Sequence, residues 1–162
     1  MSDTSRLTGT FTLRSGRITD TYFDKYRFES DPVLLRDVAA LMIPLLPHDT
    51  EVLAGLEMGG IPVVTMLSQL TGLPAAFIRN TAKTYGTAGY AEGAALAGRN
   101  VILIEDVVSS GGAILAALAK LRADGIEPRE AVCVIDREAG AGEALAAAGL
   151  RLHAVFRMSE IP

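Results

Sequence analysis

The stretch that decides the fold is Val101-Ile-Leu-Ile-Glu105-Asp106-Val-Val-Ser109-Ser110-Gly111-Gly112-Ala113. An apolar run rich in β-branched residues ends in two adjacent acids, a Ser-Ser-Gly-Gly turn follows, and a helix-like apolar pattern begins after it. This order predicts a buried strand, a loop and the N-terminus of a helix. A helix that begins with small residues can bind a phosphate, because its free backbone N–H groups and its dipole both favour a negative charge.

The two acids indicate a sugar beside that phosphate. A carboxylate does not contact a phosphate directly, since like charges repel, but it suits ribose hydroxyls or a metal ion. The hydroxyls of Ser109 and Ser110 can add donors to the phosphate. The segment therefore predicts a site for a phosphorylated sugar. An ordinary strand-to-helix junction capped by Asp and Ser is the alternative.

The amino-acid composition limits which classes of protein the chain can belong to. The chain has 162 residues, 49% hydrophobic and 21% charged, which is typical of one folded domain over residues 1–162 and argues against disorder. Its net charge of -4 gives no basic footprint for nucleic acid. The single cysteine, Cys133, lies in an apolar run and is expected to be a buried thiol. Without a disulfide framework, a signal peptide or a bilayer-length apolar run, we expect a cytoplasmic protein with no membrane partner.

Strands and helices are predicted to alternate from residue 32 onward. The predicted strands cover residues 51–56, 74–79, 101–105, 130–136 and 151–156. The predicted helices cover residues 32–46, the stretch from the turn at 58–62 to about 70, 113–123 and 143–148. Residues 80–98 predict a long loop or a loose hairpin. The alternation predicts an α/β fold with a parallel sheet covered on both faces, in which ligands bind at the carboxyl ends of the strands.

Residues 101–113 closely resemble the phosphoribosyl pyrophosphate (PRPP) motif of type I phosphoribosyltransferases. In that family the two acids contact the ribose 2- and 3-hydroxyls and the loop holds the 5-phosphate. The resemblance implies these ribose contacts for Glu105 and Asp106. It implies phosphate contacts for Val107, Val108, Ser109, Ser110, Gly111, Gly112 and Ala113. It also implies a central, mostly parallel sheet with helices on both faces and a small N-terminal hood.

A second strand-turn-helix junction is predicted at Leu56-Glu-Met-Gly-Gly-Ile-Pro62. Its glycines can present backbone N–H groups to a pyrophosphate, although a simple tight turn fits the pattern equally well. The segment resembles the pyrophosphate loop of the same family, which implies PRPP contacts for Met58 and Gly59. Some relatives place a lysine where Gly59 stands.

A basic segment, Arg79-Asn-Thr-Ala-Lys-Thr-Tyr-Gly86, follows another predicted strand. Displacing pyrophosphate from C1 of ribose builds negative charge on the leaving group, which cations on a closing loop stabilise. A solvated basic loop is the alternative. The segment resembles the catalytic loop of orotate phosphoribosyltransferases, Arg-Lys-x-x-Lys-x-His-Gly. Asn80 replaces the first lysine and Tyr85 stands at the histidine. The resemblance implies PRPP contacts for Arg79, Lys83 and Tyr85, with Arg79, Lys83 and Asp106 catalytic.

Two further segments resemble the same branch. Phe11-Thr-Leu-Arg-Ser-Gly-Arg17 matches its N-terminal signature, which implies that Arg14 contacts PRPP. Tyr22 and Phe23 match an aromatic pair that lies along the pyrimidine ring, with core packing as the alternative. Arg137 matches an arginine that binds the orotate carboxylate as a planar fork, with a surface ion pair as the alternative. The resemblance adds Ser109 to the orotate contacts.

The resemblance thus implies an orotate phosphoribosyltransferase with orotate and PRPP as substrates. Its cofactor would be Mg²⁺, held mainly by PRPP and water with no direct protein ligand. The family implies a homodimer in which the loop 80–98 serves the neighbouring active site. Two other functions stay open: transfer to another base such as a purine, or a non-catalytic regulator on this fold that senses PRPP or a nucleotide.

Overall fold

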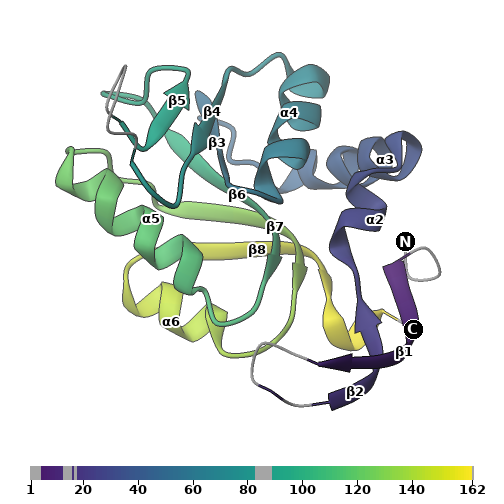
Figure 1. The fold of residues 1–162 in the computed structure, drawn as a ribbon. Coiled ribbons are helices and arrows are strands. Elements are labelled where there is room, and N and C mark those ends of the chain that lie inside the picture. The colour runs from purple at the N-terminus through teal and green to yellow at the C-terminus, as the bar shows by residue number, and fades with distance from the viewer. Residues whose placement is uncertain (1–4, 13–15, 17, 83–88, 162) are drawn as a thin grey trace.

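The computed structural model describes residues 5–12, 16, 18–82 and 89–161 of the chain. Its centre is a six-stranded sheet with the strand order β5-β4-β3-β6-β7-β8 (Figure 1). Neighbouring strands are parallel except for β4 and β5, which are antiparallel. The strands are β3 Val52–Leu56, β4 Ala75–Ile78, β5 Ala91–Gly93, β6 Val101–Val108, β7 Glu130–Asp136 and β8 Arg151–Arg157. The expected mostly parallel sheet is confirmed.

Helices cover both faces of this sheet (Figure 1). They are α2 Lys25–Glu29, α3 Pro32–Met42, α4 Gly60–Thr71, α5 Gly112–Ala123 and α6 Ala141–Ala147, with short 3₁₀ helices at Ile43–Leu45 and Met158–Glu160. Alternate residues of a strand point to opposite faces, so Ala54 joins a core with Leu118 of α5 while Leu53 joins a second core with Leu67 of α4. None of the described helices is long and apolar enough to cross a membrane.

Strand β6 is longer than the sequence pattern predicts. The expected strand ends at residue 105, whereas β6 continues to Val108 because Val107 and Val108 keep their pairing with β7. Glu105, expected as the last residue of the strand, and Asp106, expected after it, therefore both lie inside the strand. This correction matters for the site, because a residue inside the sheet is more deeply buried than a residue on a loop.

The helix boundaries follow local signals. Asp31 caps α3 by accepting hydrogen bonds from the backbone N–H groups of Val33 and Leu34, at 2.9 and 3.1 Å. The helix expected over 32–46 is α-helical only to Met42 and continues as a 3₁₀ turn. Helix α4 ends at Gly72, whose φ of 75° lies in the left-handed region, as its glycine predicts. Helix α6 begins at Ala141, two residues before its expected start.

The segment 80–98 contains a strand where it is described. Ala91–Gly93 forms β5 and pairs with β4, which supports the loose hairpin over the loop. Residues 83–88 lie outside the described residues.

An N-terminal hood precedes the sheet. Strands β1 Arg6–Thr12 and β2 Ile18–Phe23 form a separate antiparallel pair, and α2 leads from them to α3 (Figure 1). The backbone N–H of Asp24 donates to Ser5 O at 2.8 Å, and the Asp24 side chain caps α2. The sequence pattern assigned no elements here, but the hood that the resemblance implies is present.

Candidate active site

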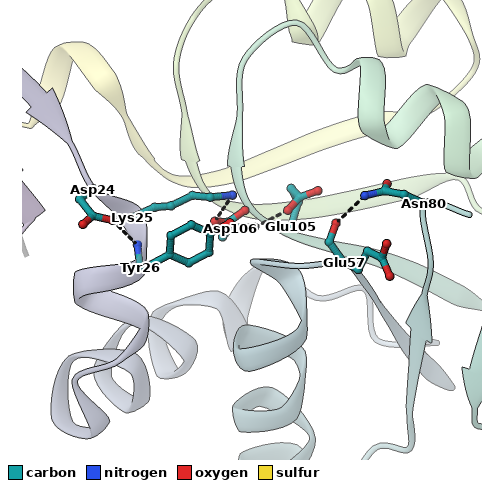
Figure 2. A network of polar contacts seen from close by, with 7 residues as sticks. All are labelled: Asp24, Lys25, Tyr26, Glu57, Asn80, Glu105 and Asp106. Atoms are coloured by element: carbon teal, nitrogen blue, oxygen red, sulfur yellow. Dashed lines mark hydrogen bonds and ion pairs between the residues drawn. The ribbon is translucent and has the colours of Figure 1, made fainter. Parts of the chain in front are cut away.

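The predicted site residues gather where two strand-turn-helix junctions meet. Strand β3 leads through residues 57–59 into α4, and the neighbouring strand β6 leads through residues 109–111 into α5. Figure 2 shows the polar side chains between these junctions and the hood helix α2. The carboxyl ends of the parallel strands thus form one edge, as expected for this class of sheet.

A cavity of about 540 Å³ opens at the β6-α5 junction. It is lined by Asn80, Glu105 and residues 107–114. Gly111 has a φ of 78° and immediately precedes α5, so the loop turns sharply into the N-terminus of a twelve-residue helix. Free N–H groups and the helix dipole then favour an anion in the cavity. The structure therefore brings together the whole predicted loop from Val107 to Ala113.

The β3-α4 junction approaches β6 so closely that it excludes side chains. A Cβ atom on Gly60 would lie 2.6 Å from the backbone oxygen of Ile104, and a Cβ atom on Gly59 would overlap the Asp106 carboxylate. Gly60 is therefore required by packing against backbone, whereas a side chain at Gly59 would require the Asp106 carboxylate to shift. The lysine that some relatives place at the position of Gly59 would displace Asp106 here. Met58 is exposed at the tip of the loop, and its peptide bond to Glu57 is cis.

The two acids of β6 are in different environments. Glu105 lines the cavity and is 7% exposed, whereas Asp106 is fully buried. The backbone N–H of Asp106 donates to Glu105 Oε1 at 3.1 Å. Burial, then the interaction with Asp106, raise the pKa of Glu105 well above its ordinary value. Burial also pushes the pKa of Asp106 upward, but interactions with Glu105, Glu29 and Lys25 outweigh it and hold the pKa at about 2.

Helix α2 supplies two charged residues that the sequence analysis missed. Lys25 Nζ lies 2.8 Å from Asp106 Oδ2, and Glu29, one turn later, is close enough for the Asp106 carboxylate to shift its pKa. Burial, then the interaction with Asp106, raise the pKa of Glu29 to about 9. At neutral pH the cluster therefore holds an ionised Asp106, a protonated Glu29 and a charged Lys25. The only available sequence signal was the i,i+4 spacing of Lys25 and Glu29, which a solvated helix face shows equally often.

Residues 79 and 80, at the end of β4, form hydrogen bonds with three other segments of the chain. The backbone N–H of Arg79 donates to Tyr90 O at 2.6 Å, and Lys120 Nζ of α5 donates to Asn80 O at 2.6 Å. The hydroxyl of Tyr90 donates to Asp124 at 3.0 Å. Asn80 Nδ2 reaches Glu57 O at 3.5 Å and so links this strand to the β3-α4 loop (Figure 2). Arg79 Nε is buried without a hydrogen-bond partner among the described residues.

Arg137 follows β7 at the same edge of the sheet. Its backbone N–H donates to Val108 O at 2.8 Å, and its side chain is exposed. Asp136 accepts from the backbone of Glu138, and Glu138 accepts from the backbone of Ser159. Within the part of the chain that the structure describes, Arg137 forms no ion pair with either acid. The structure therefore does not support the alternative of a surface ion pair, and the guanidinium is available to a ligand.

The structure gives less support to the remaining residues that were predicted to contact orotate or PRPP. Phe23 is half-buried and packs against the core that contains Phe28, so core packing accounts for part of its role. Tyr22 lies beside it in β2. Arg14, Lys83 and Tyr85 lie outside the described residues, and their contacts with PRPP stay predictions.

Comparison with known proteins identifies the class to which this fold and site belong. Residues 28–148 match the family model described as phosphoribosyl transferase domain. This span contains both junctions, the acid pair and Arg137. The class is therefore that of the phosphoribosyltransferases.

Individual relatives show to which family of phosphoribosyltransferases the chain belongs. An orotate phosphoribosyltransferase from Nocardioides sp. is 52% identical over 156 residues, which cover 96% of this chain and 87% of the relative. The crystal structure of the Mycobacterium tuberculosis orotate phosphoribosyltransferase has a TM-score of 0.86 at 31% identity, covering 99% of this chain and 93% of that one. A structure of that enzyme in complex with PRPP has a TM-score of 0.78 at 28% identity, covering 87% and 83% of the two chains. The chain belongs to the orotate phosphoribosyltransferase family.

The packing at Gly59 can be tested by substitution. We expect Gly59→Ala to lower the free energy of unfolding by about 1–3 kcal/mol, because the new methyl group overpacks against the Asp106 carboxylate. Gly142→Ala is the matched control, since a Cβ atom there meets nothing within 4 Å and its helical position favours alanine. Urea denaturation measures both. Equal stability of the two variants would contradict the packing argument.

The raised pKa of Glu29 predicts a pH-dependent effect of Glu29→Gln on stability. The pKa of Glu29 is 4.5 in the unfolded chain and about 9 in the folded chain. At a pH between these two values, Glu29 is ionised in the unfolded chain but keeps its proton in the folded chain. The free energy of unfolding therefore falls as the pH rises through this range. Glutamine cannot ionise. The stability of Glu29→Gln relative to the native chain should therefore increase from pH 5 to pH 8.5 in urea titrations. Asp37→Asn, at an exposed position on α3, should show no such trend. A pH-independent difference for Glu29→Gln would refute the assignment.

Proposed function

We propose that this chain transfers the phosphoribosyl group of PRPP to orotate, which gives orotidine 5-monophosphate and pyrophosphate. The observation that carries the proposal is the cavity between the carboxyl group of Glu105 and the N-terminus of α5. Such a cavity suits a phosphorylated ribose. Membership of the orotate phosphoribosyltransferase family supports the choice of reaction.

Each part of the site has a role in this reaction. The backbone N–H groups between residues 107 and 113 bind the 5-phosphate, and Glu105 and Asp106 accept hydrogen bonds from the ribose hydroxyls. Arg79 and Lys83 stabilise the negative charge that develops on pyrophosphate as it leaves C1. Orotate supplies its own nucleophilic nitrogen, so the enzyme mainly positions the reactants and stabilises charge.

Mg²⁺ is the cofactor in this proposal. Among the described residues, no group of three or more His, Cys, Asp or Glu side chains could hold a metal ion. The resemblance to the family implies that PRPP oxygens and water would hold the cation, and Glu105 would be a carboxyl group in the wall of the same cavity. When bound, the cation would neutralise part of the charge on the pyrophosphate.

The substrate base can be tested by direct assay. We expect PRPP-dependent consumption of orotate, but not of uracil or adenine, in the presence of Mg²⁺. Arg137→Ala should lower kcat/KM for orotate by about tenfold or more while PRPP affinity stays unchanged, because a charged hydrogen bond to the orotate carboxylate contributes about 1.5–3 kcal/mol. Arg129→Ala, at the opposite end of β7, is the control.

The assay also separates the alternatives. Consumption of a purine instead of orotate would assign the chain to another base. Binding of PRPP without turnover of any base would instead indicate a regulator. The exposed guanidinium of Arg137, unpaired with its neighbouring acids, favours a carboxylate-bearing base.

A homodimer with shared active sites is part of the same proposal. Its support is the resemblance of residues 79–86 to the catalytic loop of the family. Mixing Lys83→Ala with Asp106→Asn should restore part of the activity that each variant lacks, because a mixed dimer contains one site with both residues intact. Subunit exchange is verified by native mass spectrometry. No recovery after verified exchange would argue against a shared site.

A further inference from the structure

The ribose-binding acid Asp106 is covered in the structure. Its side chain is 0% exposed, although the proposed function requires it to accept hydrogen bonds from substrate hydroxyls. Lys25 lies 2.8 Å from one carboxylate oxygen, Gly59 packs against the same oxygen, and the carboxyl groups of Glu29 and Glu105 lie near enough to couple with Asp106 electrostatically. Substrate therefore reaches Asp106 only if one of these groups moves.

Lys25 is the group best able to move. Gly59 contributes backbone that is held against β6, while Glu29 and Glu105 are each 7% exposed. The Lys25 side chain is 32% exposed and reaches Asp106 through a flexible four-carbon stem. Its ammonium group also lies 5.2 Å from the centre of the Tyr26 ring. Figure 2 shows this side chain extending from α2 to Asp106.

We propose that Lys25 is a PRPP-binding residue. Its ammonium group pairs with Asp106 in the free protein and moves to contact the pyrophosphate when the ribose hydroxyls bind to Asp106. This inference rests on the proposed function, since it takes PRPP as the ligand. Lys25 thereby becomes a PRPP-binding cation supplied by the hood, in addition to Arg79 and Lys83.

Charge and distance both favour this exchange. The ammonium group is already beside the β3-α4 loop, because its partner Asp106 Oδ2 occupies the space in front of Gly59. An ammonium group has three N–H donors, so it can contact several phosphate oxygens after it leaves the carboxylate. PRPP brings several negative charges close to Asp106, and a nearby cation offsets their repulsion. In turn, the released carboxylate, whose oxygens have no hydrogen-bond partner among the described residues, can accept from the ribose.

Two other roles for Lys25 give different results. If Lys25 only positions Asp106, it acts through that carboxylate alone. Removing Lys25 then has no effect on PRPP affinity in the Asp106→Asn background. A residue that only blocks the site competes with substrate, so its removal strengthens PRPP binding. A residue that contacts PRPP contributes affinity whether or not Asp106 is ionised.

The experiment is calorimetric titration of PRPP into Lys25→Met, in the native background and in the Asp106→Asn background. Methionine keeps the length of the stem and removes the charge. We expect about a tenfold or greater loss of PRPP affinity in both backgrounds, as for a lost charged hydrogen bond. The dependence of log Kd on log salt concentration should also become shallower. Lys25→Arg should bind PRPP nearly as tightly as the native chain, and Arg27→Met, on the same helix, should have no effect.

The outcomes separate this inference from the proposed function. If the native chain binds no PRPP, the proposed function itself fails. If the native chain binds PRPP and Lys25→Met binds it equally or more tightly, only the role of Lys25 fails. A loss of affinity in the native background that disappears in Asp106→Asn would also overturn direct contact, since Lys25 would then act only through Asp106.

Discussion

The structure depends on the close approach of the β3-α4 loop to strand β6. A side chain at Gly60 would meet the backbone carbonyl of Ile104, and one at Gly59 would displace the Asp106 carboxylate. This contact sets the distance between two helix N-termini that belong to neighbouring parallel strands. It also buries Asp106, so that the carboxylate needs charged partners. The contact between the β3-α4 loop and β6 therefore determines both the backbone packing and the electrostatics of the site.

The burial of Asp106 explains how the hood is attached to the sheet. An ionised carboxylate away from water requires a counter-charge, and α2 supplies it through Lys25, 2.8 Å from Asp106. Phe28 of the same helix is fully buried between the hood and the core. The hood that carries Tyr22 and Phe23 is thus joined to the ribose acids by polar contacts as well as apolar ones. Movement at one of these sites necessarily affects the other.

The sequence predicted those parts of the site that depend on local signals. The strand, acid pair and glycine loop of residues 101–113 lie consecutively, so their arrangement follows from the backbone alone. Gly72 and Asp31 likewise marked their helix ends through local hydrogen bonding and φ preference. The end of β6 was wrong by three residues, because pairing with β7 and not the local pattern extends it. Lys25 and Glu29 were missed because their partner is some eighty positions away in the chain, and only tertiary packing brings them together.

The hydrogen bonds around the end of β4 have a consequence for how this family can diversify. Arg79 is bonded to Tyr90, Asn80 to Lys120, and Tyr90 to Asp124, so both flanks of residues 83–88 are anchored to the sheet and to α5. The entropy of closing a loop between fixed ends grows slowly, by about 0.6 kcal/mol for each doubling of length. The pairing of β4 with β5 is held by contacts of residues outside 83–88. The composition of residues 83–88 can therefore change while these anchoring contacts are kept.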